Sequence, residues 1–551
     1  MTRSAISARA AWWAALAALC LVLVAPLLVC DVPPLIDYPN HLARLFVLAS
    51  LPGDAELAKF YGSHWSVIPN LALDLAGPPL MQVLPVYDVG RLLIAVAVLL
   101  PVLGTIAYAS ALGGRWWALG VGLVAWNNCL LYGFLNFSIG IGLALLLAAV
   151  WLRWRETQPN RMVAIATFGA LALFACHLMG LVFFAVLIGG AELFRVWTSA
   201  KERTGRLTGQ SRLATVMDRG ACPQRRPGGG RASQGVDGGP AATMTGGRAS
   251  RTAPVPVLRE ALRRGLVLCL VLAAPALLYA ASDLSQLGGD AAFLPYGEKL
   301  LQLAGVFSNY LGWLDAATAS VAIGLPMLWV LTRHGRFPGV AAVPMSVLFA
   351  AFLAAPYAWK GTYHLDTRLA VMLDFMLFAG FVPKRWPRGP SVLAAAAIIL
   401  LFAARMAVLT TAWAAHQTDI DDIRRVLEPV RPGQAVYVAA AVGPNSRSMS
   451  DGSRTDIHLG ALALIERRAW WPFEFDNVSQ QPLQTRPPYS AMAGRVGDLP
   501  DAAQAATADV CGFDYVLLTG AGAAAALPPE RFRLLRRSGF AALYGIARCE
   551  P

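Results

Sequence analysis

Long apolar stretches recur along this chain, and they constrain its fold more than any other feature of the sequence. Each runs for about 20 residues, which is long enough for a helix to cross the ~30 Å hydrocarbon core of a bilayer. Of the 551 residues, 56% are hydrophobic and only 14% are charged. A soluble protein could not bury this much apolar surface. The sequence therefore predicts a polytopic membrane protein that is mainly α-helical.

We expect about eleven membrane spans. The first covers 10–30, and its length favours a membrane span over a cleaved signal peptide. Ten further apolar segments cover 88–110, 116–134, 137–152, 162–178, 180–196, 264–282, 317–332, 339–356, 368–383 and 390–412. Together these segments predict a transmembrane helix bundle over 1–413.

The basic residues between the spans indicate the orientation of the bundle. With the N-terminus in the cytoplasm, every basic cluster falls on the cytoplasmic side, as the positive-inside rule requires. These clusters are Arg115, then Arg153 and Arg155, then a long basic loop, then Arg333 and Arg336, then Lys384, Arg385 and Arg388. An odd number of spans places the loop 31–87 and the tail 414–551 together on the outer side.

The long basic loop covers 198–262 and explains much of the formal net charge of +13. Its many arginines stand among Gly, Ser and Pro, a composition that cannot order a packed core. We expect a disordered cytoplasmic loop beside anionic lipid headgroups. No aromatic residue lies between Trp197 and Tyr279, whereas nucleic-acid binding usually needs aromatic side chains among the basic ones. A nucleic-acid partner is therefore not expected.

The tail 414–551 has a different character. Strand-like runs at 435–440, 514–520 and 541–547 alternate with polar, helix-forming stretches, which predicts a small α/β domain outside the membrane. Cys511 and Cys549 both lie in this tail, and in an oxidising compartment they could pair; two free thiols are the alternative.

The first outer loop carries the richest group of polar residues, in the stretch DVPPLIDYPNHLARL. It contains Asp31, Asp37, His41 and Arg44, with His41 and Arg44 three apart on one face of a predicted helix. Asp37 could act as a general base, and Arg44 could clamp a phosphate or carboxylate group. A polar cap at the start of a helix explains these residues equally well.

A second polar group, WKGTYHLDTR, lies between two spans at the outer side. Lys360, His364, Asp366 and Arg368 could bind a phosphate leaving group, on which negative charge grows as a glycosyl bond breaks. An interfacial belt of aromatic rings and snorkelling cations is the alternative interpretation.

Two charges fall inside the predicted spans, where they are costly. Asp374 and Arg405 each lie about 10 Å from the outer end of their span, given a rise of ~1.5 Å per residue. We expect them to form a structural salt bridge between adjacent helices, with a proton or ion path as the alternative.

Three smaller features allow two interpretations each. Asn136 belongs to a polar outer turn that could line a sugar site or cap a helix. His177 is expected to pack between helices, since no Cys or His follows at zinc spacing. The aromatic residues of the tail could stack on carbohydrate or form the core of the domain; they are Trp470, Trp471, Phe473 and Phe475.

This layout resembles the GT-C superfamily of integral membrane glycosyltransferases, which likewise have a first span followed by an acidic outer loop, about eleven spans and an outer α/β domain. The resemblance implies a polyprenyl-phosphate-linked sugar donor and a catalytic carboxylate in the first outer loop. Carried onto this chain, that carboxylate is Asp37 or Asp31, and the stretch DYPNH favours Asp37. Lys360 and Arg368 would hold the carrier phosphate. The adjacent acidic pair frequent in the family is absent here.

The resemblance also implies a bacterial inner-membrane location with the C-terminal domain in the periplasm. It allows a divalent metal, which the sequence itself does not indicate. The leading hypothesis is transfer of a lipid-linked sugar. The alternatives are a transporter with Asp374 and Arg405 on its path and a non-catalytic scaffold whose outer domain binds a partner. The sugar, the acceptor and the oligomeric state are not predicted.

Overall fold

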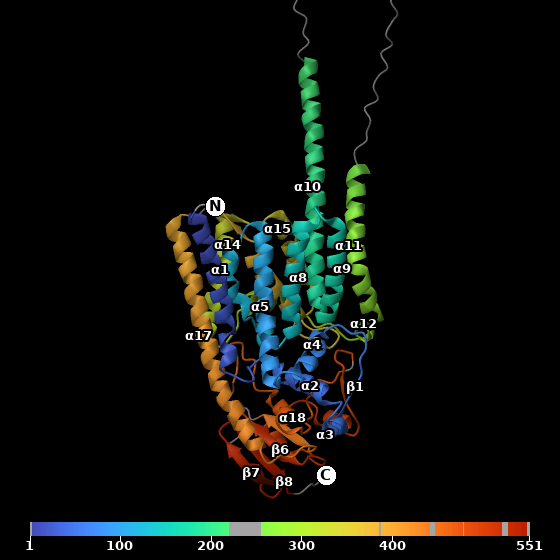
Figure 1. Cartoon of the computed structure of the whole chain (residues 1–551), viewed down its shortest axis with the longest axis vertical. Coiled ribbons are helices and arrows are strands. Elements are labelled where there is room, and N and C mark those ends of the chain that lie inside the picture. Colours follow the sequence, from blue (N-terminus) through green and yellow to red (C-terminus); the bar gives the residue numbers. More distant parts are fainter. Residues whose placement is uncertain are drawn as a thin grey trace, which may run out of the picture.

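The computed structural model describes residues 3–219, 255–384, 387–440, 447–477, 479–520 and 527–547. A helix bundle forms the larger part, and the C-terminal sheet lies at the end of the bundle opposite the N-terminus (Figure 1). Eight helices in the described part of the chain are long and apolar enough to cross a membrane. The chain is therefore an integral membrane protein, and the predicted fold class is confirmed.

Every predicted span contains helical residues. The long helices are α1 (Arg3–Val24), α5 (Val86–Leu112), α8 (Leu135–Trp154), α9 (Pro159–Cys176), α10 (Leu178–Arg219), α11 (Val255–Ala281), α14 (Gly312–Leu331) and α17 (Arg388–Leu427). Shorter helices are α15 (Gly339–Ala354), α16 (Leu365–Ala379) and, within 116–134, η2 (Trp117–Val121), α6 (Gly122–Ala125) and α7 (Asn128–Leu131). The segment 116–134 is interrupted because the Asn127 side chain accepts a hydrogen bond from Leu130 N and so starts a new helix.

The basic loop differs from its prediction at both ends. Helix α10 continues to Arg219 and α11 begins at Val255, so 198–219 and 255–262 are helical rather than disordered. Half of the residues there are Arg, Leu, Ala, Lys and Glu, which favour helices. The rest of the predicted disordered loop lies outside the described residues.

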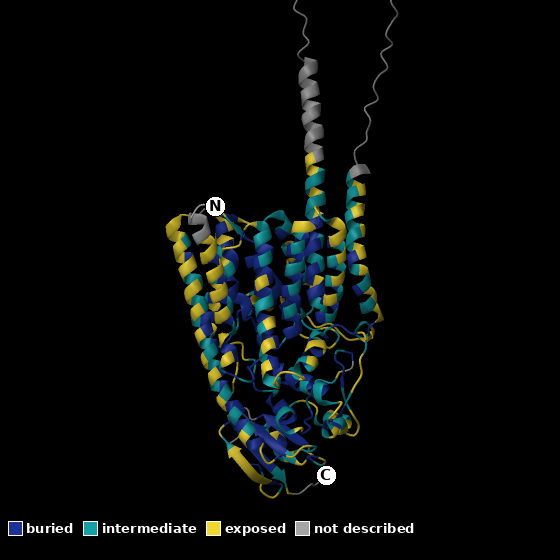
Figure 2. Ribbon diagram, viewed as in Figure 1, coloured by how far each residue is buried: buried dark blue, intermediate teal, exposed yellow. Residues whose placement is uncertain are grey.

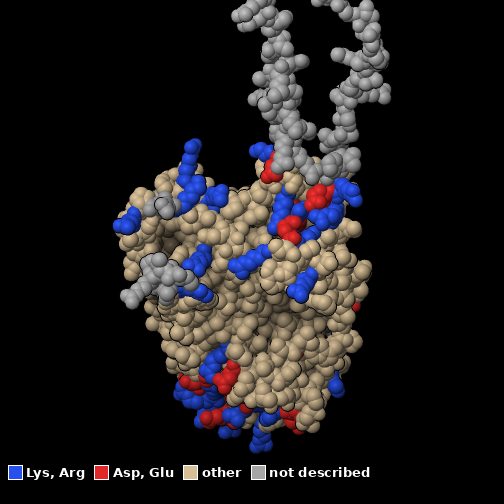
Figure 3. Space-filling view, turned by 45° about the horizontal axis from the view of Figure 1, so that its top comes forward, with Lys and Arg blue, Asp and Glu red and all other residues tan. Residues whose placement is uncertain are grey.

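The two ends of the bundle differ in charge. At one end, Trp12 Nε1 donates to Arg115 O at 3.4 Å, and β2 (Gly335–Arg336) pairs with β3 (Val382–Pro383). Figure 3 shows Lys and Arg side chains gathered at this end, from which α10 and α11 project, with a broad uncharged surface below them. At the other end, Leu71 N donates to Ala175 O at 2.7 Å. The charge asymmetry agrees with the predicted clustering of basic residues on one side.

The segment 31–87, predicted as an outer loop, is a structured layer rather than a simple connection. It contains α2 (Tyr38–Ser50), α3 (Ala55–Phe60), β1 (Tyr61–Ser63) and α4 (Ala72–Met81). Three more short helices lie at the other connections: η1 (Ala25–Leu28), α12 (Asp283–Gln286) and α13 (Tyr296–Gly305). Strand β1 pairs antiparallel with β5 (Leu483–Thr485) of the tail, which attaches the layer to the C-terminal part.

The tail forms a four-stranded sheet in the order β4 (Val436–Ala440), β6 (Tyr515–Thr519), β8 (Ala541–Ile546), β7 (Phe532–Ser538). Strands β4 and β6 are parallel and the other pairs antiparallel. The helical elements of the tail are η3 (Leu459–Ala461), α18 (Leu462–Arg467), α19 (Tyr489–Val496) and α20 (Ala502–Thr507). Trp470 and Trp471 are buried, so these two aromatics belong to the core.

Bundle, layer and sheet share one hydrophobic core. Figure 2 shows buried residues extending from the middle of the bundle into the sheet. Helix α17 runs through the expected domain boundary near residue 413 and packs its last turns on β7 and β8. A continuous helix therefore connects the bundle to the C-terminal sheet.

The predicted salt bridge between Asp374 and Arg405 is wrong. Arg405 Nη1 instead donates to Asp315 Oδ1 at 2.6 Å, because α17 packs beside α14. The other Asp315 oxygen accepts from Ser450 Oγ at 2.6 Å. Asp374 lines an apolar groove, and its Oδ2 has no hydrogen-bond partner among the described residues. The depth of each charge along its span could be counted from the sequence. Which helices pack side by side could not be predicted.

Candidate active site

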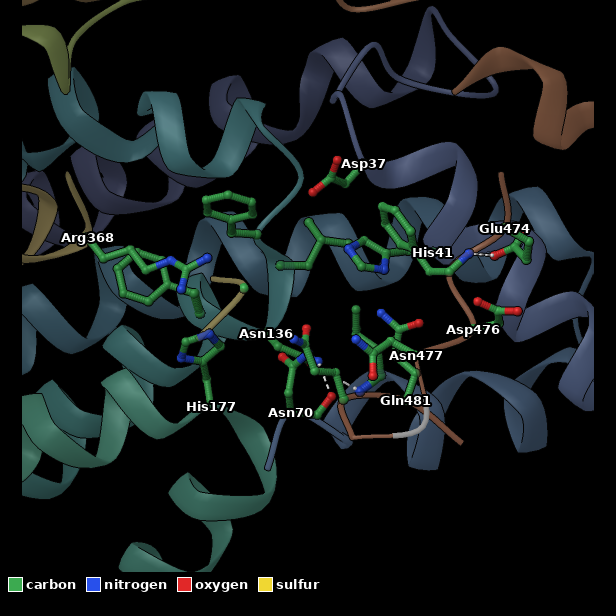
Figure 4. A pocket seen from close by; sticks show the side chains of 17 residues that line it. Asp37, His41, Asn70, Asn136, His177, Arg368, Glu474, Asp476, Asn477 and Gln481 are labelled. Atoms are coloured by element: carbon green, nitrogen blue, oxygen red, sulfur yellow. Dashed lines mark hydrogen bonds between the residues drawn. The ribbon is translucent and has the colours of Figure 1, made fainter. Parts of the chain in front are cut away.

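A cavity of about 350 Å³ lies where the helix bundle, the 31–87 layer and the tail meet. This volume suits a small polar ligand. Its polar wall consists of Asp37, His41, Asn70, Asn136, His177, Arg368, Glu474, Asp476, Asn477, Gln480 and Gln481. Figure 4 shows Asp37 and Arg368 reaching the cavity from different elements, with the amides along another side.

Asp37 is held in place by its backbone. Asp37 N donates to Tyr132 O at 3.0 Å, and Ile36 N donates to Leu131 O at 2.9 Å. The turn that accepts these bonds needs Gly133, whose φ is +98°. A Cβ at Gly133 would lie 2.8 Å from both Asp37 N and Asp37 Cβ. This turn therefore fixes the position of Asp37 at the start of α2.

His458, from the tail, faces the Asp37 carboxylate. Its Nε2 lies 3.5 Å from Asp37 Oδ1. Asn40 Nδ2, which can only donate, lies 3.0 Å from His458 Nδ1. The Nδ1 atom is therefore the acceptor, and a neutral His458 carries its hydrogen on Nε2, towards Asp37. Sequence reasoning missed His458 because nothing local marks a histidine whose partners lie in the first outer loop.

Arg44 does not serve as the predicted anion clamp. It is buried in a bidentate ion pair with Asp74, with Nε 2.7 Å from Oδ1 and Nη2 3.2 Å from Oδ2. Its Nη1 donates to His41 Nδ1 at 3.0 Å. Burial, followed by the charge of Arg44, lowers the pKa of His41 to about 3. His41 is therefore neutral, with Nε2–H as its donor, and Arg44 is structural.

Arg368 supplies positive charge at the cavity. Its Cζ lies 4.5 Å from the centroid of the Phe134 ring and 5.9 Å from that of Phe137. These cation–π contacts hold a guanidinium that is only 7% exposed. Arg368 Nε has no hydrogen-bond partner among the described residues. The side chain is therefore oriented by the aromatic rings and keeps donor capacity for an anionic ligand.

The tail closes the cavity with residues that the sequence did not single out. Glu474 accepts from Trp471 Nε1 at 3.4 Å and from Phe475 N at 3.1 Å. Burial raises the pKa of Glu474 to about 8, so its neutral form prevails at pH 7. Only Phe475 of the predicted aromatic residues lines the cavity.

Two residues of the bundle complete the wall. Asn136 Nδ2 donates to Asn70 O at 2.7 Å, and its Oδ1 accepts from Leu73 N at 3.2 Å. The His177 ring lies 5.5 Å from that of Phe137, as expected for a packing residue, and it also lines the cavity. Its Nδ1 accepts from Met179 N at 3.1 Å, which leaves Nε2–H as the donor of a neutral ring.

The remaining candidate residues do not line the cavity. Asp31 is bound by Arg424 Nη1 at 2.7 Å and by Arg91 Nη1 at 3.3 Å. Lys360 Nζ donates to Ser285 O at 2.9 Å. His364 and Asp366 also have other partners. His364 Nε2 lies 3.3 Å from Tyr357 Oη, and an Asp366 carboxylate oxygen lies 3.8 Å from Lys299 Nζ. Of the 359–368 candidates, the structure brings only Arg368 to Asp37.

Two further expectations concern cysteines and metals. Cys511 is disulfide-bonded, while Cys549, its predicted partner, lies outside the described residues. Within the described ranges, no three His, Cys, Asp or Glu side chains are grouped to hold a metal ion.

Comparisons with known proteins identify a structural relative. No family model and no curated protein matches the sequence. The crystal structure of ArnT from Cupriavidus metallidurans bound to undecaprenyl phosphate is 12% identical, with a TM-score of 0.51 over 98% of this chain and 99% of that chain. The apo state of the same protein gives a TM-score of 0.49 at 12% identity and 98% coverage of both chains. At this identity the likeness shows the fold alone: the chain shares the overall fold of the ArnT structure along nearly its whole length.

Proposed function

We propose that this chain is a membrane glycosyltransferase that moves a sugar from a polyprenyl-phosphate carrier to an acceptor hydroxyl at the outer face of the membrane. The observation that carries the proposal is the shared cavity of Asp37 and Arg368. A base and a cation that line one small polar cavity are what such a transfer needs. The fold supports the same function, since the ArnT structure of this fold holds undecaprenyl phosphate.

In this reaction the acceptor oxygen attacks the anomeric carbon of the sugar while Asp37 takes the hydroxyl proton. The bond from the anomeric carbon to the phosphate oxygen breaks, and its electron pair stays on the carrier phosphate. Arg368 offsets the growing negative charge there. His458 Nε2–H faces Asp37 Oδ1 at 3.5 Å and orients the base. The single displacement inverts the configuration at the anomeric carbon.

The rest of the wall suits a polyhydroxylated substrate. Asn477, Gln480 and Gln481 offer amide donors and acceptors together. Neutral His41 and His177 add N–H donors, and protonated Glu474 can donate to a sugar oxygen. Phe134 and Phe475 give apolar surface for the C–H face of a sugar ring.

The orientation of the bundle supports a reaction at the outer face. The cavity lies where the bundle meets the layer and the tail, at the end opposite the N-terminus (Figure 1), whereas Lys and Arg side chains gather around the end where the N-terminus lies (Figure 3). Under the positive-inside rule the basic end faces the cytoplasm. The cavity and the C-terminal sheet would then face the periplasm of a bacterial inner membrane. The transporter alternative placed Asp374 and Arg405 on one path, whereas Arg405 pairs with Asp315.

The transfer is tested with the full chain in detergent, a panel of synthetic polyprenyl-phosphate sugars as donors, and added membrane lipids. The measured quantity is the polyprenyl phosphate released. Asp37→Asn should lower the rate of transfer by a factor of about 10²–10⁴, which is the usual contribution of a general base. Asp31→Asn is the matched control, since Asp31 sits in an ion-pair network outside the cavity and should keep most of the rate. Equal rates in wild type and Asp37→Asn would refute the assignment of the base.

A further inference from the structure

A second cavity lies between α17 and the tail, apart from the Asp37 cavity. Its volume is about 700 Å³, and it is bounded by α17, the segment 447–455 and the turn between β7 and β8. It shares no lining residue with the Asp37 cavity. None of its polar residues takes part in the proposed transfer.

The cavity contains a buried polar group without a partner. His416 is 1% exposed, yet it lines the cavity, and neither of its ring nitrogens has a hydrogen-bond partner among the described residues. Its closest charged neighbour is Asp419, with Nδ1 3.7 Å from Oδ2. A buried imidazole without hydrogen bonds is costly unless a ligand or water satisfies it. A neutral imidazole offers one N–H and one lone pair, which together match a hydroxyl group.

The charges around His416 argue against an anion. Arg447 is the cation of the wall, and Asp419 binds it with both oxygens, at 2.8 Å from Nε and 3.3 Å from Nη2. The second carboxylate, Asp422, accepts from Phe540 N at 2.8 Å and pairs with Arg425. The wall has no surplus positive charge for a phosphate and no uncommitted carboxylate for a metal cation or an amine.

The groups of the wall that remain available to a ligand are neutral and can exchange hydrogen bonds with a hydroxyl group. Ser448 also lines the cavity, and Phe540 and Pro34 give apolar surface. Hydrogen-bonding groups next to apolar surface are the features by which proteins hold a sugar ring. We propose that this second cavity binds a neutral carbohydrate group.

The position of the cavity indicates from where a carbohydrate group could enter it. Ala412 and Ala415 of α17 line the cavity, and the apolar run of that helix ends near residue 412. The cavity therefore lies at the level of the membrane surface, where the headgroup of a glycolipid or a free sugar could enter. The segment 447–458 borders the cavity with Arg447 and ends at His458, which contacts Asp37. Binding can be measured without any transfer, so the inference stands independently of the proposed reaction.

The test uses the full chain in phosphatidylcholine nanodiscs and follows its thermal unfolding midpoint. One arm adds free galactose or glucose, and the other incorporates galactosyl or glucosyl diacylglycerol into the discs. A ligand that binds only the folded state raises the midpoint in proportion to its affinity. A rise of the midpoint with the free sugars would show that the sugar alone is sufficient for binding. A rise only with the glycolipids would show that the cavity binds a lipid-borne headgroup. Either result supports the proposal.

Variants locate the binding. His416→Phe removes both ring nitrogens, and Ala415→Leu fills the cavity while keeping His416; each should weaken apparent affinity at least about tenfold. Thr411→Val is the matched control, because the Thr411 hydroxyl bonds only its own helix, at Ala407 O and Val408 O. Asp37→Asn tests whether the sugar binds in the first cavity instead. No shift with any probe, or shifts that survive both cavity variants but vanish in Asp37→Asn, would overturn the proposal.

Discussion

Glu474 shows how a single residue of this site depends on its surroundings. It lies in the tail, borders the Asp37 cavity and is 7% exposed. Because burial raises its pKa from an ordinary value of 4.5 to about 8, the folded chain binds a proton that the unfolded chain releases between these two values. The contribution of Glu474 to stability is therefore fully present below pH 4.5 and is lost as the pH rises through about 8.

Glu474→Gln removes this titration while keeping the shape of the side chain. Relative to wild type, the variant should gain stability progressively from pH 5 to pH 9, by up to about 5 kcal/mol if the whole pKa shift is realised. Thermal unfolding of both proteins across this range measures the difference. A pH-independent difference between wild type and Glu474→Gln would contradict the assignment.

Sequence reasoning at the residue scale singled out candidates that stand in local polar stretches. Asp37 and His41 were found from one polar stretch, and Arg368 from another, and the structure places all three at one cavity. Arg44 was assigned to a ligand because its partner, Asp74, lies in a different helix of the layer. His458 and Glu474 were missed because their role depends on the tail folding back onto the first outer loop.

At the scale of elements, the turn before α8 determines where Asp37 sits. Gly133→Ala introduces a Cβ 2.8 Å from the Asp37 backbone at a φ of +98°. Gly113 has a similar φ of +92° but open space around it, so Gly113→Ala carries the backbone strain without the clash. Both variants should lose about 1–3 kcal/mol of stability. Only Gly133→Ala should also lose transfer activity, at least about tenfold, in the polyprenyl-phosphate release assay. Equal activity losses would show that the turn does not position the base.

Elements were predicted well where the apolar pattern was long. The positions of the long spans follow from length and composition alone, whereas 116–134 broke into short helices at a capping asparagine, Asn127. The layer 31–87 could not be seen as a structured unit, because its strand β1 is completed only by β5 of the tail. The ends of α10 and α11 were missed because a basic, glycine-containing composition was taken to indicate disorder along the whole loop.

At the scale of the whole molecule, the active-site hypothesis depends on three parts meeting. The bundle supplies Arg368, the layer supplies Asp37 and the tail supplies Glu474. Helix α17 connects the bundle to the sheet, because it runs from one onto the other. Hydropathy and charge predicted that the layer and the tail share one side of the membrane. The contact between them required the folded chain.

The central claim is that the cavity of Asp37 receives the phosphate of a polyprenyl carrier beside Arg368. Since the sugar is unidentified, the most direct measurement is binding of undecaprenyl phosphate to the full chain, followed by native mass spectrometry. Arg368→Gln should weaken binding by about tenfold or more, while Lys360→Gln, whose ammonium group bonds Ser285 O outside the cavity, should bind as wild type does. Undiminished binding by Arg368→Gln, or a loss confined to Lys360→Gln, would contradict this account of the site.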